Sequence, residues 1–168
     1  MKLIRLLKMI NTIKNWFRYD PFEWKVKISA GIIIILRNEK ILLCHPTGHS
    51  WDDSFSFPKG GVDEGESNVD AAIRELREET SLIIDKNQID NLNRPIIVNY
   101  RNKKGRKYKK VVLFTVRIDS VSEVGLSRDI IEKERLQLDE VDWCGFLTKQ
   151  DAHPKIFHRF AHLLDLIK

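Results

Sequence analysis

The amino-acid sequence predicts an α+β or α/β fold, in which a mixed β-sheet is sandwiched between helices within a single domain. Two observations support this prediction. Segments with the β-strand pattern precede and follow a helical segment in the middle of the chain, and a second helical segment ends it. The chain also has 168 residues, 42% hydrophobic and 32% charged, with no repeat and no flexible linker. This length and composition suit one globular core and exclude general disorder.

Apolar runs bounded by turn residues define the expected strands. Residues 25–36 end in five consecutive Ile and Leu residues and form the first strand. Residues 41–45 form the second strand and pair with the first as a hairpin across the polar turn 37–40. The remaining strands, of which the first is short and ends at Pro58, are expected at 54–57, 95–101, 107–118 and 141–147.

Two helices are expected within this domain. Ser67 lies three residues before Asp70, as at the start of a capped helix, and the chain then reaches Thr80 without a helix breaker. The apolar residues of this helix share one face that should point into the core, namely Val69, Ala72, Ile73 and Leu76. Residues 154–168 carry apolar side chains at helical spacing and form the expected C-terminal helix.

Residues 1–24 are interpreted as an N-terminal extension that forms a basic amphipathic helix, and residues 25–168 as the domain itself. The apolar residues of the extension recur every three or four positions, at Leu3, Leu6, Ile10, Ile13 and Phe17. Arg5 and Lys8 interrupt this apolar character and no small-residue cleavage site follows, which argues against a secretory signal. Three roles stay open: packing on its own domain, docking on a protein partner or second copy, or contact with an anionic membrane surface or nucleic acid.

The charge of the chain is unevenly distributed. The formal net charge is +5, yet residues 60–80 hold seven acids and two arginines, a local charge of −5. On the expected helix, three- and four-residue spacings place Glu75, Glu78 and Glu79 together, away from the apolar face. Like carboxylates repel one another unless a cation lies between them. Oxygen ligands at this density suit Mg²⁺, or Mn²⁺, so this segment is interpreted as a metal site.

The segment GGVDEGESNVDAAIRELREETSL, residues 60–82, resembles the Nudix box. The matching positions are Gly60, Glu66, Arg74, Glu75, Leu76, Glu78, Glu79 and Leu82. Ser81 replaces the last Gly of the box, where a helix commonly ends in a left-handed conformation that favours Gly by about 1 kcal/mol. We therefore expect Ser81→Gly to raise stability without abolishing turnover. The resemblance also implies the fold of the Nudix family over about residues 25–168.

The resemblance implies metal-dependent hydrolysis of a phosphoanhydride bond in a nucleoside diphosphate linked to another moiety. The implied metal ligands are Glu75, Glu78, Glu79 and the backbone carbonyl of Lys59. The implied catalytic residues are Glu78 or Glu79, which orients or deprotonates the attacking water, and Arg74, which braces the glutamates through ion pairs. Glu66 is expected to support the loop or a metal-bound water. The base can instead come from a later loop, where Glu132, Glu134, Asp139 and Glu140 stay open.

Substrate contacts are assigned on fewer features. Phe57-Pro58-Lys59-Gly60 resembles the approach to the box in diadenosine polyphosphate hydrolases and mRNA-decapping members, so Phe57 and Lys59 are assigned to substrate binding; alternatively, Lys59 is an exposed turn residue. Trp51 and Phe55 are expected to stack on a base, or else to belong to the core. The resemblance thus favours a dinucleoside polyphosphate or similar nucleotide. The alternatives are an RNA cap or 5′ end, and a module that binds nucleotide or RNA without turnover.

Residues 101–110 contain seven cations and no acid, with Tyr100 and Tyr108 interleaved. They either protect a hairpin edge or attract a polyphosphate or an RNA backbone. Cys44 and Cys144 lie far apart in the sequence, without a C-x-x-C pair, so we expect two buried thiols and no disulfide, as suits a cytoplasmic protein. No apolar run approaches the roughly 20 residues of a membrane span.

Overall fold

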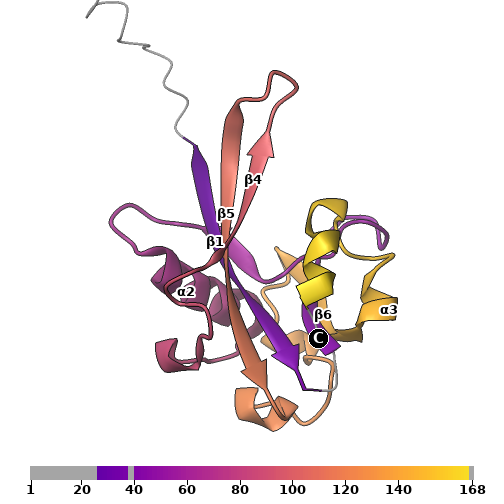
Figure 1. Ribbon diagram of the computed structural model, residues 1–168. Coiled ribbons are helices and arrows are strands. Elements are labelled where there is room, and N and C mark those ends of the chain that lie inside the picture. The colour runs from indigo at the N-terminus through magenta and orange to yellow at the C-terminus, as the bar shows by residue number, and fades with distance from the viewer. Residues whose placement is uncertain (1–25, 38–39, 167–168) are drawn as a thin grey trace, which may run out of the picture.

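The computed structural model describes residues 26–37 and 40–166, and its centre is a six-stranded mixed sheet (Figure 1). The strand order is β4-β5-β1-β2-β6, with β3 paired to β1. The strands are β1 (Lys27–Leu36), β2 (Lys40–Pro46), β3 (Lys59–Gly61), β4 (Ile96–Arg101), β5 (Lys107–Ile118) and β6 (Val141–Thr148). β1 runs parallel to β5 and antiparallel to β2 and β3. The predicted mixed sheet is confirmed.

Helices cover both faces of this sheet. The long helix α2 (Asn68–Thr80) lies on one side of the strands in Figure 1, and the C-terminal 3₁₀ helix η4 (His158–Leu166) lies on the other. The shorter helical elements are η1 (Lys86–Gln88), η2 (Val121–Val124), η3 (Lys133–Arg135) and α3 (Lys149–Ala152). Ala72 and Leu76 of α2 pack in one core cluster, and Phe160 of η4 packs in a second cluster. Because both faces are covered, the central strand β1 is buried from Ser29 to Leu36, which explains its unbroken apolar run.

The largest difference from the expected elements lies around β3. Residues 54–57 form only isolated bridges, Cys44 with Ser56 and Phe55 with Ile156, and the regular strand starts at Lys59 instead. Gly31 of β1 allows this pairing, because a Cβ at Gly31 would lie 2.4 Å from the Pro58 carbonyl oxygen. The glycine-rich stretch expected to be a turn is therefore a short strand paired to β1.

The C-terminal helix differs less from the expected one. The expected C-terminal helix over 154–168 is a shorter 3₁₀ helix, η4, and still buries the predicted apolar residues Phe160, Leu163 and Leu164. The expected helix over residues 1–24 lies outside the described residues. Within the described part of the chain, no helix combines the length and the apolar character needed to cross a membrane.

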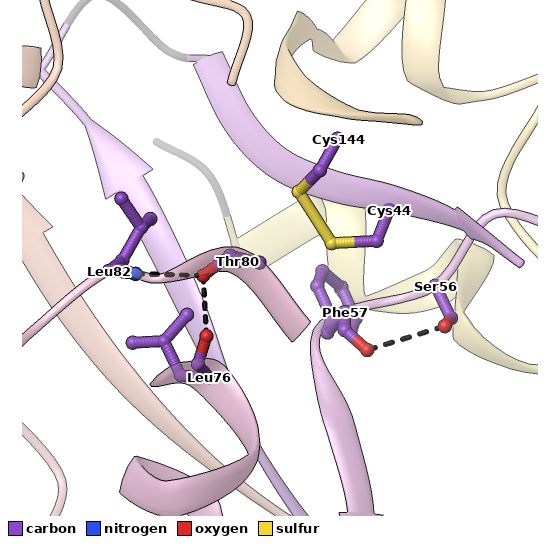
Figure 2. The surroundings of a disulfide bond; sticks show 7 residues. All are labelled: Cys44, Ser56, Phe57, Leu76, Thr80, Leu82 and Cys144. Carbon is purple, nitrogen blue, oxygen red and sulfur yellow. Dashed lines mark hydrogen bonds between the residues drawn. A yellow bond between two sulfur atoms is a disulfide. The ribbon is translucent and has the colours of Figure 1, made fainter. Parts of the chain in front are cut away.

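Cys44 and Cys144 form a disulfide, so the expectation of two separate thiols is wrong (Figure 2). They are 100 residues apart in the sequence, but the antiparallel register of β2 and β6 places them directly opposite one another. Both side chains are buried in the core. The disulfide removes the inference of a reducing compartment, which rested on unpaired thiols.

Candidate metal site

Helix α2 begins and ends at capped residues that lie next to the site. At its start, the Ser67 hydroxyl accepts a hydrogen bond from the Asp70 amide at 3.2 Å. At its end, the Thr80 hydroxyl donates to the Leu76 carbonyl and accepts from the Leu82 amide (Figure 2). The Ser67 bond satisfies a backbone amide that a helix leaves unpaired at its start, and the Thr80 bonds join the last turn of the helix to the residue that follows Ser81. The capped start expected at Ser67 is confirmed.

Ser81 ends the helix in the left-handed conformation, with φ of 57°. The conformation usual at the last Gly of the box is therefore kept without the Gly. The Ser81 hydroxyl donates a hydrogen bond to the Arg135 carbonyl at 2.6 Å, a contact that Gly cannot make. A net gain in stability from Ser81→Gly no longer follows, because the relief of strain is offset by loss of this bond.

Three carboxylates come together beside the helix, from Glu75 and Glu79 of α2 and from Glu140 just before β6. Each offers an oxygen atom, and these atoms lie within 4.8 Å of one another. Glu75 and Glu79 are only 8% and 6% exposed. Burial raises the pKa of Glu79 to about 8, although the nearby Lys59 ammonium and a hydrogen bond from the Lys59 backbone lower it. Burial also raises the pKa of Glu75, against the effect of Arg74.

This carboxylate cluster fits a divalent cation. Its donors are all oxygen atoms, which Mg²⁺ and Mn²⁺ prefer, and one side of it is open because Glu140 is exposed. The raised pKa values show that the cations of Arg74 and Lys59 do not fully compensate the buried charge. A bound divalent ion would supply the missing positive charge.

Strand β3 also contacts the cluster through its backbone at Gly60. A Cβ on Gly60 would lie 2.0 Å from Glu75 Oε2, so the Glu75 carboxylate lies directly against the α-carbon of Gly60. This close approach gives a physical reason for Gly at the first position of the box. Lys59, the residue before it, is half-buried at the start of β3.

Arg74 links the acids of this region. Its Nε and Nη2 atoms donate to the two carboxylate oxygens of Glu66, both at 3.0 Å. Nη1 donates to Glu75 at 2.8 Å and to Glu78 at 2.9 Å, and Nη2 also donates to the Gly61 carbonyl at 2.8 Å. These hydrogen bonds raise the pKa of Arg74 and lower that of Glu66. Arg74 thus forms the ion pairs expected of a brace, while its part in catalysis stays a prediction.

The structure shows which of the candidate acids lie in the carboxylate cluster and which lie outside it. Glu140 joins Glu75 and Glu79 because the loop before β6 packs on the end of α2, where the Gln137 amide donates to the Glu79 carbonyl at 3.3 Å. Glu132 instead pairs with Arg128 and Arg135. Glu134 and Asp139 are exposed and lie outside the cluster. Glu78, expected to be a metal ligand, is not in the cluster and its carboxylate is bonded to Arg74.

The aromatic residues assigned to substrate binding differ in their exposure to solvent. Trp51 is 52% exposed, and its indole stacks on the His45 ring with centroids 4.3 Å apart and planes 9° apart. Phe57 and Phe55 are fully buried. Phe57 packs against Phe160 of η4, with ring centroids 5.6 Å apart. We therefore correct the assignment of Phe57, which belongs to the core. Phe55 follows the core alternative left open for it, and Trp51 is the exposed aromatic.

The fold is a mixed β-sheet with helices on both faces, and the site is a carboxylate cluster suited to a divalent cation. The chain belongs to the NUDIX family, since the family model described as the NUDIX domain matches residues 25–160. The box resemblance, the sheet and the helices all agree with this membership.

Two curated relatives and one solved structure illustrate the similarity. The RNA pyrophosphohydrolase of Caulobacter vibrioides (strain NA1000 / CB15N) is 30% identical over 127 residues, covering 63% of this chain and 69% of the relative. The RNA pyrophosphohydrolase of Psychrobacter sp. (strain PRwf-1) is 43% identical over 56 residues, 33% of this chain, and the match spans only 31% of that relative. The C. elegans Ap4A hydrolase binary complex has a TM-score of 0.60 and 25% identity, covering 83% of this chain and 93% of that one.

Proposed function

We propose that this protein is a Nudix hydrolase that uses Mg²⁺, or Mn²⁺, to hydrolyse a phosphoanhydride bond in a nucleoside diphosphate linked to another moiety. The observation that carries the proposal is the buried cluster of Glu75, Glu79 and Glu140, whose charge the protein's own cations leave partly uncompensated. When bound, a divalent ion would neutralise phosphate oxygens and lower the pKa of a water molecule.

We assign the ion to these three carboxylates and to the backbone carbonyl of Lys59. The side chain of Glu78 is 50% accessible, whereas Glu79 is buried. We therefore assign to Glu78 the role of orienting or deprotonating the attacking water, with Glu79 as the alternative. Arg74 holds Glu75 and Glu78 in place and keeps Glu66 against the loop. The Lys59 ammonium lies beside the cluster, where it attracts the substrate phosphates.

A dinucleoside polyphosphate or similar small nucleotide is the first substrate proposed. The similarity to the Ap4A hydrolase of C. elegans supports it, as does the exposed, stacked indole of Trp51, which offers a face to a base. An RNA cap or 5′ end is the alternative, supported by relatives that are RNA pyrophosphohydrolases and by the basic residues 101–110. A cytoplasmic location suits both classes of substrate. We further propose that residues 1–24 contact a membrane surface or a protein partner. Deletion of residues 1–20 should then abolish binding to anionic vesicles if the contact is with a membrane.

The proposal is tested with purified protein, Mg²⁺ and a set of substrates: dinucleoside polyphosphates, ADP-ribose, NADH, nucleoside triphosphates, and capped and 5′-triphosphate RNA. Glu78→Gln/Glu79→Gln should lower turnover by at least about 100-fold, because it removes the water-orienting carboxylate and a buried ligand. Glu64→Gln/Glu134→Gln removes two exposed acids outside the cluster and should leave turnover unchanged. If no substrate is hydrolysed, or if the two double variants are equally active, the enzymatic proposal fails.

A further inference from the structure

The hairpin of β4 and β5 carries a dense positive charge on the part that extends beyond the helices in Figure 1. Five of its seven cations are exposed and two are half-buried; in chain order they are Arg101, Lys103, Lys104, Arg106, Lys107, Lys109 and Lys110. In the described part of the chain none of them lies within ion-pair distance of an acid. Lysines can protect a hairpin edge, but seven cations without an acidic partner among the described residues also make a strongly positive surface, and such a surface attracts anionic ligands.

The register of the sheet extends this charge inward from the hairpin. Tyr100 of β4 lies opposite Lys109 of β5, and Lys109 lies opposite Lys27 of β1. These three side chains form a row across neighbouring strands. The Lys109 ammonium lies 5.8 Å from the centre of the Tyr100 ring, and the Arg159 guanidinium, from η4, lies 4.9 Å from it. The Tyr100 ring therefore lies close to two cations at the base of the hairpin.

The same row reaches the carboxylate cluster. Lys27 and Lys109 line one pocket together with Gly61, the last residue of β3 and a partner of Arg74. Lys59, two residues earlier on β3, lies opposite Gly31 of β1 and directly precedes Gly60, whose α-carbon lies against the Glu75 carboxylate. Cations therefore continue from the metal site to the hairpin tip. We call this surface the basic track: Lys59, Lys109, Lys27, Arg159 and the exposed hairpin cations at 101, 103, 104, 106 and 107.

We propose that the basic track binds the phosphate backbone of single-stranded RNA whose phosphorylated 5′ end lies at the carboxylate cluster. The inference rests on the proposed function and names the longer substrate for the same site. From Lys109 to the turn at Gly105 the hairpin extends a further four residues, about 13 Å of strand. A dinucleotide bound at the carboxylate cluster has no phosphates to place along this extension, whereas an RNA chain does. Tyr108, 43% exposed on the hairpin, offers a ring for a base, as single-strand binding surfaces do.

The binding test uses a 16-nucleotide RNA with a 5′-hydroxyl end, in EDTA, by fluorescence anisotropy over a range of KCl. Each phosphate contact to single-stranded RNA contributes about 0.7 to the slope of log affinity against log salt, so four contacts account for roughly a 50-fold loss between 50 and 200 mM. Lys103→Gln/Lys104→Gln/Arg106→Gln/Lys107→Gln should lower the slope by about 3 for that reason. The matched control removes four exposed charges elsewhere, in Arg94→Gln/Arg117→Gln/Arg128→Gln/Lys149→Gln, and should keep the slope. Equal weakening in the two variants would overturn the proposal.

Tyr108 supplies an independent test of the same surface. Tyr108→Ala should weaken RNA binding at least about fivefold, because base stacking on an aromatic ring is lost. Tyr108→Phe keeps the ring and should bind as the unchanged protein does. If the Ala variant binds as tightly as the Phe variant, no base stacks there and the proposed path is wrong. Binding of the protein to vesicles of phosphatidylserine and phosphatidylcholine, without binding to RNA, would overturn it in favour of a membrane surface.

Turnover separates this inference from the proposed function. With Mg²⁺, the hairpin variant should hydrolyse diadenosine tetraphosphate with unchanged kcat/KM, because the carboxylate cluster is intact. Its kcat/KM for 5′-triphosphate RNA should fall at least about tenfold, because the backbone contacts are lost. An equal fall for both substrates would show that the hairpin does not select RNA. If the unchanged protein hydrolyses none of the substrates in the set, the proposed function fails, whereas the salt dependence of RNA binding still decides whether the track exists.

Discussion

Gly60→Ala is the sharpest perturbation of the site, because it adds one methyl group where β3 contacts Glu75. The new Cβ would lie 2.0, 2.1 and 2.3 Å from the Oε2, Cδ and Oε1 atoms of Glu75, whereas ordinary contacts are 3.4 Å or longer. Strand and carboxylate must therefore separate by more than 1 Å. If the carboxylate moves, it loses its 2.8 Å hydrogen bond from Arg74 and leaves the cluster with Glu79.

The expected effect on stability and metal binding follows from this clash. Overpacking of this kind costs about 1–3 kcal/mol, which lowers the Tm of a chain of this size by roughly 2–4 °C for each kcal/mol. Displacement of one ligand should weaken Mg²⁺ binding by about 10- to 100-fold, as loss of the groups that orient a ligand does. Thermal unfolding with and without Mg²⁺, together with calorimetric titration of Mg²⁺, measures both effects.

Gly61→Ala is the matched control for this change. A Cβ on Gly61 has no atom within 4 Å, and neither Gly60 nor Gly61 has a positive φ, so only Gly60→Ala introduces a clash. Gly61→Ala should keep Mg²⁺ affinity and leave stability unchanged or slightly higher, since alanine restricts the unfolded chain. If Gly60→Ala binds Mg²⁺ as tightly as Gly61→Ala, the Glu75 carboxylate does not lie against β3, and the reasoning is refuted.

Further predictions concern the end of α2, the buried charge and the brace. Ser81→Gly should change the free energy of unfolding by less than about 1 kcal/mol, because strain is relieved while the bond to Arg135 is lost; a larger gain in urea titrations would show that this bond contributes nothing. In EDTA, the free energy of unfolding should fall from pH 5 to pH 8 by up to about 1.4 kcal/mol per pH unit. The reason is that the pKa of Glu79, about 8 in the folded protein against an ordinary value of 4.5, lets only the folded state keep the proton there. Over the same range Mg²⁺ affinity should rise, since the ion displaces that proton; equal slopes for Glu79→Gln and the unchanged protein would contradict both expectations. Arg74→Lys should weaken Mg²⁺ binding about tenfold, because lysine cannot keep the paired bonds to Glu66 while bonding Glu75; unchanged affinity in calorimetry would show that charge alone suffices.

Local patterns were enough to predict much of this protein. The strand β1 follows from a run of Ile and Leu, because a strand covered on both faces needs apolar side chains at every position. Helix α2 follows from its cap at Ser67 and its uninterrupted helical spacing. That spacing also places Glu75 and Glu79 on one face, since both depend on residues within a few positions of one another.

Tertiary structure decided what depends on segments far apart in the chain. Strand pairing set Cys44 opposite Cys144 and turned the glycine-rich segment into β3, because register and partner are not encoded within a short window. The loop before β6 packs against α2 and so brings Glu140 to the cluster. The sequence around Glu132, Glu134, Asp139 and Glu140 did not distinguish among these four acids. By itself the sequence determined the family, the helix and the acidic face. The structure determined which acids meet, that Phe57 is buried, and that cations run from the site to the hairpin, since burial and distance exist only once distant strands are paired.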